Sequence, residues 1–147
     1  MAVENTSPEL KKQLGALYLY LSTRLEIKHP PAKVVFINSE ENAKNLFGLT
    51  GYYDSTTKTI KIYITGRLDT DILRSFCHEM IHFWQDERGT LPTENHTTGA
   101  HYAQEDIVLR KREMEAYLLG SLIFRDWQDE NRYGPPPIPP ILPAPYD

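Results

Sequence analysis

The sequence predicts an α+β fold, with an N-terminal helix, a small and mainly antiparallel sheet, and two further helices. Three observations lead to this prediction. Leucines recur at helical spacing near the N-terminus, short runs of β-branched and aromatic residues follow, and two longer helical patterns fill the second half of the chain. The 147 residues suffice for one hydrophobic core. We therefore expect a single domain over residues 1–133 and a proline-rich tail over 134–147.

The first half of the chain contains one helix and the strands. Ser7 and Pro8 stand in cap and first-turn positions, and Leu10, Leu14, Leu17 and Leu21 follow at helical spacing, so a helix is expected to end before His29. KVVFINS, from residue 33, is a β-branched and aromatic run that predicts a strand. Residues 51–65 predict two strands around the polar turn DSTTK.

The second half contains two helices and the tail. A helix is expected from a cap at Asp69 or Thr70 to about Arg88, with Gly89 ending it. A loop rich in Gly, Pro, Thr and Asn follows, and then a long helix from about Gln104 to Glu130. The chain ends in PPPIPPILPAPYD, which predicts an extended, polyproline-like segment.

Composition narrows the function classes. The net charge of −4 gives no general attraction to nucleic acid, and no apolar run approaches the ~20 residues of a membrane span. One cysteine, Cys77, allows no intrachain disulfide, and the N-terminus lacks the basic-then-apolar layout of a secretion signal. These features predict a cytoplasmic protein.

The stretch FCHEMIHFWQ, residues 76–85, carries the chemistry. His78 and His82 lie four residues apart, so on a helix both imidazoles can point at one ion, while Glu79 lies beside the position of a metal-bound water. This is the HExxH arrangement of two zinc ligands and a general base. The alternative is an amphipathic helix that carries two solvent-facing histidines on its polar face.

A catalytic zinc site normally has three protein ligands and an open position. The downstream candidates for the third ligand are His96, His101, Glu105, Glu113 and Glu115. A helical wheel of residues 104–130 places Glu115 within an apolar face and Glu113 on the opposite face. A carboxylate in an apolar face requires a compensating cation, which is either Arg112 or Lys111 nearby, or the metal held by the two histidines. We favour the metal, because it explains the histidine pair and the lone acid together.

HEMIH followed by the helical pair Glu115-Ala116 resembles the gluzincin class of zinc metallopeptidases, in particular its minimal single-domain members. The resemblance implies a zincin-like fold, with Zn²⁺ bound by His78, His82 and Glu115, and Glu79 as general base in peptide hydrolysis. Residues 102–130 are also similar to uncharacterised metallopeptidase-like proteins of tailed phages, which implies a bacterial or phage-infected host cell. Larger gluzincins often place an aspartate four residues after the third ligand, where this chain has Leu119. Support for a ligating histidine is therefore expected from Asp71, Ser75 or a backbone carbonyl.

Two other interpretations remain open. One is a resemblance to the SprT-like class, in which HExxH is combined with a third histidine, here His101 or His96, and which often acts on DNA-linked protein. The other is a non-catalytic structural or interaction protein with a zincin shape.

For the peptidase, we expect a peptide or protein substrate to lie as an added strand along residues 58–65. The oxyanion donor is expected to be Tyr102, His96 or His101. The proline-rich tail could contact a partner protein or the cleft of its own chain.

Overall fold

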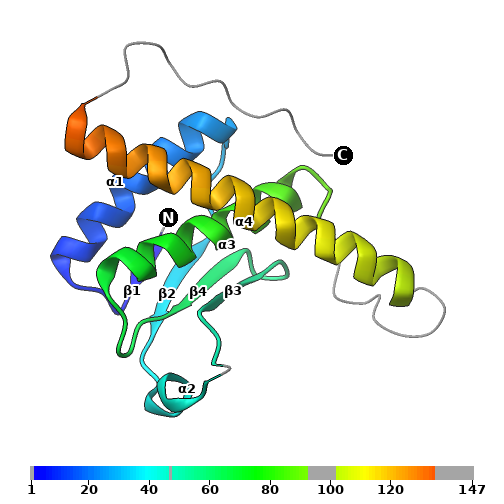
Figure 1. Ribbon diagram of the computed structural model, residues 1–147, viewed down its shortest axis with the longest axis horizontal. Coiled ribbons are helices and arrows are strands. Elements are labelled where there is room, and N and C mark those ends of the chain that lie inside the picture. The colour runs from blue at the N-terminus through cyan, green and yellow to red at the C-terminus, as the bar shows by residue number, and fades with distance from the viewer. Residues whose placement is uncertain (1, 47, 93–101, 135–147) are drawn as a thin grey trace.

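The structure is a computed structural model that describes residues 2–46, 48–92 and 102–134 (Figure 1). It has the α+β composition that the sequence predicts. In chain order the elements are β1 (Ala2–Glu4), α1 (Pro8–Leu25), β2 (Lys33–Ile37), α2 (Glu40–Lys44), β3 (Gly51–Asp54), β4 (Thr59–Tyr63), α3 (Asp69–Glu87) and α4 (Tyr102–Tyr133). The short elements β1 and α2 were not predicted.

Local sequence explains most helix ends. Ser7 caps α1 by accepting a hydrogen bond from the backbone N–H of Leu10, and the leucines at helical spacing are buried, as predicted. The predicted cap of α3 is wrong, because Leu68 occupies the N-cap without a side-chain hydrogen bond and Asp69 already lies inside the helix. Acidic side chains in the first turn favour this helix start through the helix dipole. Gly89, at φ 74°, follows the end of α3 as expected.

The sheet differs from the prediction. Its strand order is β1-β2-β4-β3, with β1 parallel to β2, β2 parallel to β4, and only β3 and β4 antiparallel. The expectation of a mainly antiparallel sheet is therefore wrong. The hairpin of β3 and β4 could be predicted from the sequence because its turn is local, whereas the parallel pairs join strands far apart in the sequence. In addition, β4 is an inner strand, so the edge on this side of the described sheet is β3.

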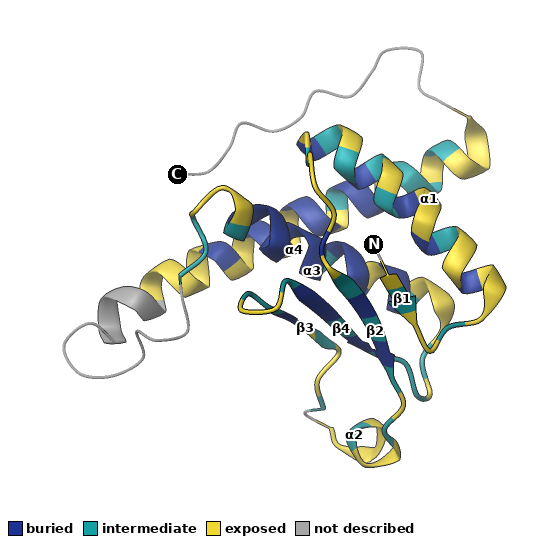
Figure 2. Ribbon diagram, turned by 180° about the vertical axis from the view of Figure 1, so that it is seen from behind, coloured by how far each residue is buried: buried dark blue, intermediate teal, exposed yellow. Residues whose placement is uncertain are grey.

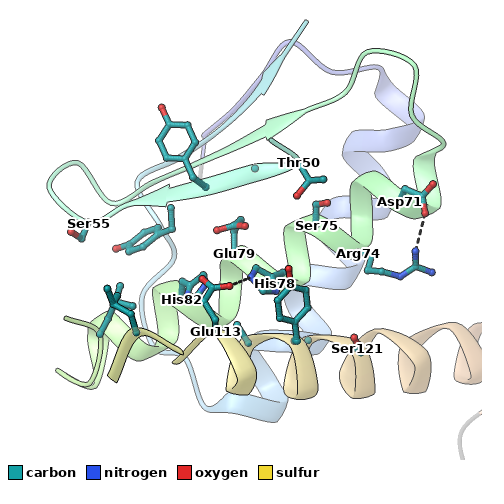
Figure 3. Close-up of a pocket in the computed structure, with 18 of the residues that line it drawn as sticks. Thr50, Ser55, Asp71, Arg74, Ser75, His78, Glu79, His82, Glu113 and Ser121 are labelled. Carbon is teal, nitrogen blue, oxygen red and sulfur yellow. Dashed lines mark hydrogen bonds and ion pairs between the residues drawn. The ribbon is translucent and has the colours of Figure 1, made fainter. Parts of the chain in front are cut away.

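The helix α3 lies between the sheet and α4 (Figures 1 and 3). It is buried along most of its length, and Figure 2 shows the buried residues concentrated in α3, in the adjoining strands and on the inner side of α1. Cys77 is fully buried in this core, as a packing residue. Around His78 and His82 the polar face of α3 is thus not freely exposed but forms one wall of a cleft.

Small residues on α4 allow close contact with α3. Ala116 and Gly120 are buried, and a Cβ on Gly120 would lie 3.4 Å from Cα of His78 and 3.5 Å from its backbone N. Glu113, Ala116 and Gly120 share one face at helical spacing. The contact at Gly120 therefore holds Glu113 beside the histidine helix.

No helix among the described residues is long and apolar enough to cross a membrane. The proline-rich segment 135–147 and the loop 93–101, which contains His96 and His101, lie outside the described residues, so what the sequence predicts for them stays a prediction.

Candidate metal centre

A cleft of about 600 Å³ opens between the edge of the sheet, α3 and α4. Ser55 lies near one end and Asp71 and Arg74 at the other, with His78 and Glu113 between them (Figure 3). Each wall comes from a different part of the sequence: β3 and its turn, the polar face of α3, and the face of α4 that carries Ala116 and Gly120. The predicted histidine pair thus lines the middle of a substrate-sized groove.

Three side chains converge in this cleft. Nε2 of His82 lies 2.7 Å from Oε1 of Glu113, and Nε2 of His78 lies 3.2 Å from Oε2 of the same carboxylate. The ligand atoms of these three residues all lie within 4.8 Å of one another. The i, i+4 spacing on α3 places the two rings edge to face, with centroids 4.9 Å apart. The structure therefore joins the two predicted histidines to Glu113.

Glu115 is not part of this cluster, so the prediction that it is the carboxylate beside the histidines is wrong. It is buried, as the wheel predicted, but its Oε1 accepts a hydrogen bond from Gln85 Nε2 at 2.9 Å and lies 3.4 Å from Nη1 of Arg112. The ordinary alternative, a salt bridge to Arg112, is what the structure has. The wheel was right that the side of α4 with Glu115 is buried, since Leu119 and Ile123 also lie in the core. It failed because the histidine cluster lies beside that buried side, in the cleft that half-exposed Glu113 lines.

Gln85 supports His82, a role that the sequence did not reveal. Its Oε1 lies 2.8 Å from Nδ1 of His82, and its Nε2 donates to the backbone carbonyl of Arg112 and to Glu115, both at 2.9 Å. Of the residues expected to support a ligating histidine, Ser75 instead accepts from Arg67 and Asp71 pairs with Arg74. The sequence held one indication of this role: Gln85 lies on the same side of the helix as both histidines.

Electrostatics favour a cation at the centre of the cluster. Burial opposes charge on His82, but its hydrogen bonds to Glu113 and Gln85 and the nearby Glu79 carboxylate outweigh burial and raise its pKa above the ordinary value. Hydrogen bonds from His78 and His82 hold the pKa of Glu113 far below its usual range. With Nδ1 facing the amide oxygen of Gln85, a neutral His82 would point a lone pair at the carboxylate. A proton or a metal ion is needed between them.

Glu79 lies in the same cleft, on the side of the sheet edge (Figure 3). Its side chain is buried, and burial raises the pKa of its carboxyl, an effect that the two histidines partly offset. A Cβ at Gly51 of β3 would lie 3.6 Å from its Cγ. Glu79 is therefore a carboxylate with increased proton affinity, held between the cluster and the edge strand.

The donor set fits a metal. Two imidazole nitrogens and one carboxylate are a common set of protein ligands for catalytic Zn²⁺, with further positions left for water or substrate. Tyr117 adds a phenol to the same cleft, with its ring centroid 4.5 Å from that of His78. Of the predicted oxyanion donors, Tyr102 begins α4, but its side chain is outside the described part of the structure. His101, the alternative third ligand, is also outside it.

Comparisons of the chain with protein-family models, with curated proteins and with solved structures find no match. The interpretation of the cleft therefore depends on its own geometry and chemistry.

Proposed function

We propose that this protein is a zinc-dependent peptidase of zincin type, in which His78, His82 and Glu113 hold the metal and Glu79 is the general base. One observation carries the proposal: the two histidines of HExxH and a carboxylate from the following helix converge at ligand distance in a cleft, beside a buried glutamate. The resemblance to gluzincins supports the same ligand types, with Glu113 in place of Glu115.

Bound Zn²⁺ would lower the pKa of a coordinated water toward ~7 and polarise the substrate carbonyl. Glu79 is suited to accept a proton from that water, because burial raises the proton affinity of its carboxylate. It can then pass the proton to the leaving amine. Gln85 keeps the ring of His82 in place, and Glu113 balances the charge of the ion.

The edge strand β3 offers a binding surface for an extended peptide. The backbone carbonyl of Thr50 accepts a hydrogen bond from the N–H of Tyr63 on β4. In an antiparallel pair every second residue bonds to the partner strand, so Gly51 and Tyr53 direct their backbone N–H and C=O groups to the open edge. This replaces the expectation of binding along residues 58–65, because β4 within that range is an inner strand. A substrate strand added at β3 would pass beside Glu79.

Tyr117 is our candidate for the donor to the developing oxyanion. It lines the cleft against His78, and a phenol O–H is chemically suited to this role. A Tyr117→Phe variant is expected to keep its metal and to lose about tenfold to a hundredfold in kcat, a moderate share of a typical oxyanion contribution. An unchanged kcat would remove Tyr117 from the mechanism.

The first experiment is elemental analysis of protein purified without added zinc. Wild type is expected to contain about one zinc per chain. After stoichiometric zinc is added, Glu113→Ala should still bind none, whereas Glu115→Ala, which keeps all three ligands, should bind about one zinc with lower affinity. The matched pair distinguishes the two acids, which lie two residues apart on α4. A protein that neither contains nor takes up metal would refute the proposal.

The second experiment tests catalysis with a fluorogenic peptide library. Glu79→Gln should keep zinc and abolish hydrolysis, because the amide cannot accept the proton. Retained hydrolysis in this variant would exclude Glu79 as the base. Zinc binding without turnover of any peptide would instead favour the structural interpretation, in which the metal only stabilises the fold.

A further inference from the structure

The contacts of Gln85 determine which way its amide faces. Both hydrogens of Nε2 are directed at groups that can only accept: the backbone carbonyl of Arg112 and the carboxylate of Glu115, each at 2.9 Å. The amide oxygen must then face His82 Nδ1, at 2.8 Å. The reversed amide would place its oxygen against a carbonyl and a carboxylate.

This orientation has a consequence for the imidazole. An amide oxygen accepts hydrogen bonds and does not donate, so Nδ1 of His82 must carry a proton. In a neutral ring the lone pair is then on Nε2, the nitrogen that faces Glu113 at 2.7 Å. This is the tautomer that can bind a metal ion from the cleft.

The buried carboxylate of Glu115 belongs to the same network as Gln85. Only about 3% of this residue is exposed, and its Oε1 contacts Gln85 and Arg112 while Oε2 has no hydrogen-bond partner among the described residues. A buried carboxylate is costly, and the ion pair with Arg112 offsets part of that cost. Gln85, with no exposed surface, is held rigidly between this pair and His82.

We propose that Gln85 and Glu115 are positioning residues: Glu115 fixes the amide orientation of Gln85, and Gln85 fixes His82 in the tautomer whose Nε2 binds metal. The proposal deepens the proposed function, because it concerns a ligand of the same centre. The two histidines then differ, because the buried network of Gln85 and Glu115 fixes the tautomer of His82 before any metal binds.

The tautomer is read from long-range ¹H–¹⁵N correlation spectra of histidine-labelled, metal-free Glu113→Ala protein at a pH where His82 is neutral, because in this background the Glu113 carboxylate no longer draws the proton to Nε2. This background should show His82 with protonated Nδ1. When Glu115→Gln is added, one of the two acceptors that fix the amide of Gln85 becomes a group that can also donate, while the carbonyl of Arg112 remains, so part of His82 should shift to the opposite tautomer. The zinc measurements use the same variants with Glu113 present. Zinc affinity, measured by chelator competition, should fall about 10- to 100-fold. Gln85→Met, which removes the acceptor from the other side, should show the same two effects.

The double variant Gln85→Glu/Glu115→Gln separates positioning from general damage to the core. It keeps one buried carboxylate and an acceptor opposite Nδ1, so the Nδ1-protonated tautomer should return, whereas zinc affinity should return only in part because the carbonyl of Arg112 loses its donor. Gln128→Met, a glutamine-to-methionine change on α4 beside a different cavity, serves as the control and should change neither readout. Unchanged tautomer and affinity in both Glu115→Gln and Gln85→Met would overturn the proposal.

The outcomes are distinguishable from failure of the proposed function. If wild type binds zinc and hydrolyses peptide but His82 keeps its tautomer in both single variants, positioning is refuted and the function stands. If wild type binds no zinc but its His82 tautomer depends on Glu115, the network positions the ring and the peptidase proposal fails.

Discussion

The close approach of α4 to α3 at Gly120 is expected to control metal binding, because it sets the position of Glu113, two helical turns earlier on α4, relative to His78. The atoms that a Cβ would meet are all backbone: Cα and N of His78, at 3.4 and 3.5 Å, and the carbonyl carbon of Cys77, at 3.6 Å. Backbone atoms inside a helix cannot rotate aside. A methyl group fits at these distances, whereas a larger side chain must separate the helices.

These distances determine how much each substitution at Gly120 should change the free energy of unfolding and the zinc affinity. Gly120→Ala gains up to about 1 kcal/mol of helix propensity and meets only van der Waals contacts, so its free energy of unfolding should be equal to that of wild type or up to about 1 kcal/mol higher. Gly120→Leu overpacks the contact and should lose about 1–3 kcal/mol. Glu113 lies seven residues earlier, about 10.5 Å along α4. A helix shift of about 1 Å there exceeds the ~0.2 Å tolerance of metal–ligand distances, so zinc affinity should fall at least about tenfold.

Urea denaturation and zinc titration of both variants test this reasoning. Gly15 on α1 is the matched control, because a Cβ there meets nothing within 4 Å. Gly15→Ala and Gly15→Leu should both raise stability by about 0.5–1 kcal/mol and leave zinc affinity unchanged. A Gly120→Leu variant with wild-type stability and zinc affinity would refute the argument that this contact sets the position of Glu113.

Three further predictions concern the cleft. Gly51→Ala should lose about 1–3 kcal/mol of unfolding free energy in urea denaturation, because its Cβ would lie 2.8 Å from the carbonyl oxygen of Lys61; an unchanged value would show that β3 moves freely. Glu79→Gln should raise the stability of metal-free protein by about 0.5–2 kcal/mol near neutral pH, because it removes a buried carboxylate whose pKa is raised; calorimetry showing a lower Tm would contradict this. His82 also has a raised pKa, so its contribution in metal-free protein is complete below about pH 6.5 and is lost as pH rises through the raised value. The pair of His82 with half-exposed Glu113 contributes about 1 kcal/mol, so Tm should fall by about 2–4 °C as the pH rises through that value. Glu113→Gln should make Tm less dependent on pH over the same range.

Local patterns in the sequence were sufficient for several features. The leucine spacing of α1, the hairpin around DSTTK and the span of α3 all depend on neighbours within a few residues, and the structure has them close to the predicted bounds. The pairing of His78 with His82 is of the same kind, because helix geometry alone places residues i and i+4 together.

Features that depend on distant segments were wrong or missed. The parallel pairs of the sheet join strands separated by whole helices and hairpins, and no local pattern records that choice. The choice between Glu113 and Glu115 failed for a related reason. A wheel orders residues around α4 and indicated its buried side, but it does not state where the histidines of α3 lie relative to that side.

The sequence by itself determined the α+β class, the main helices and two of the three residues in the cluster, because these follow from propensity and helical spacing. Only the tertiary structure decided that Glu113 completes the cluster and that Glu115 holds Gln85 against His82. The physical reason is the rotation of α4, which is fixed where buried Ala116 and Gly120 let the helix backbones approach. With that rotation set, acids two residues apart have different environments: one faces the cleft and the other is enclosed in the core.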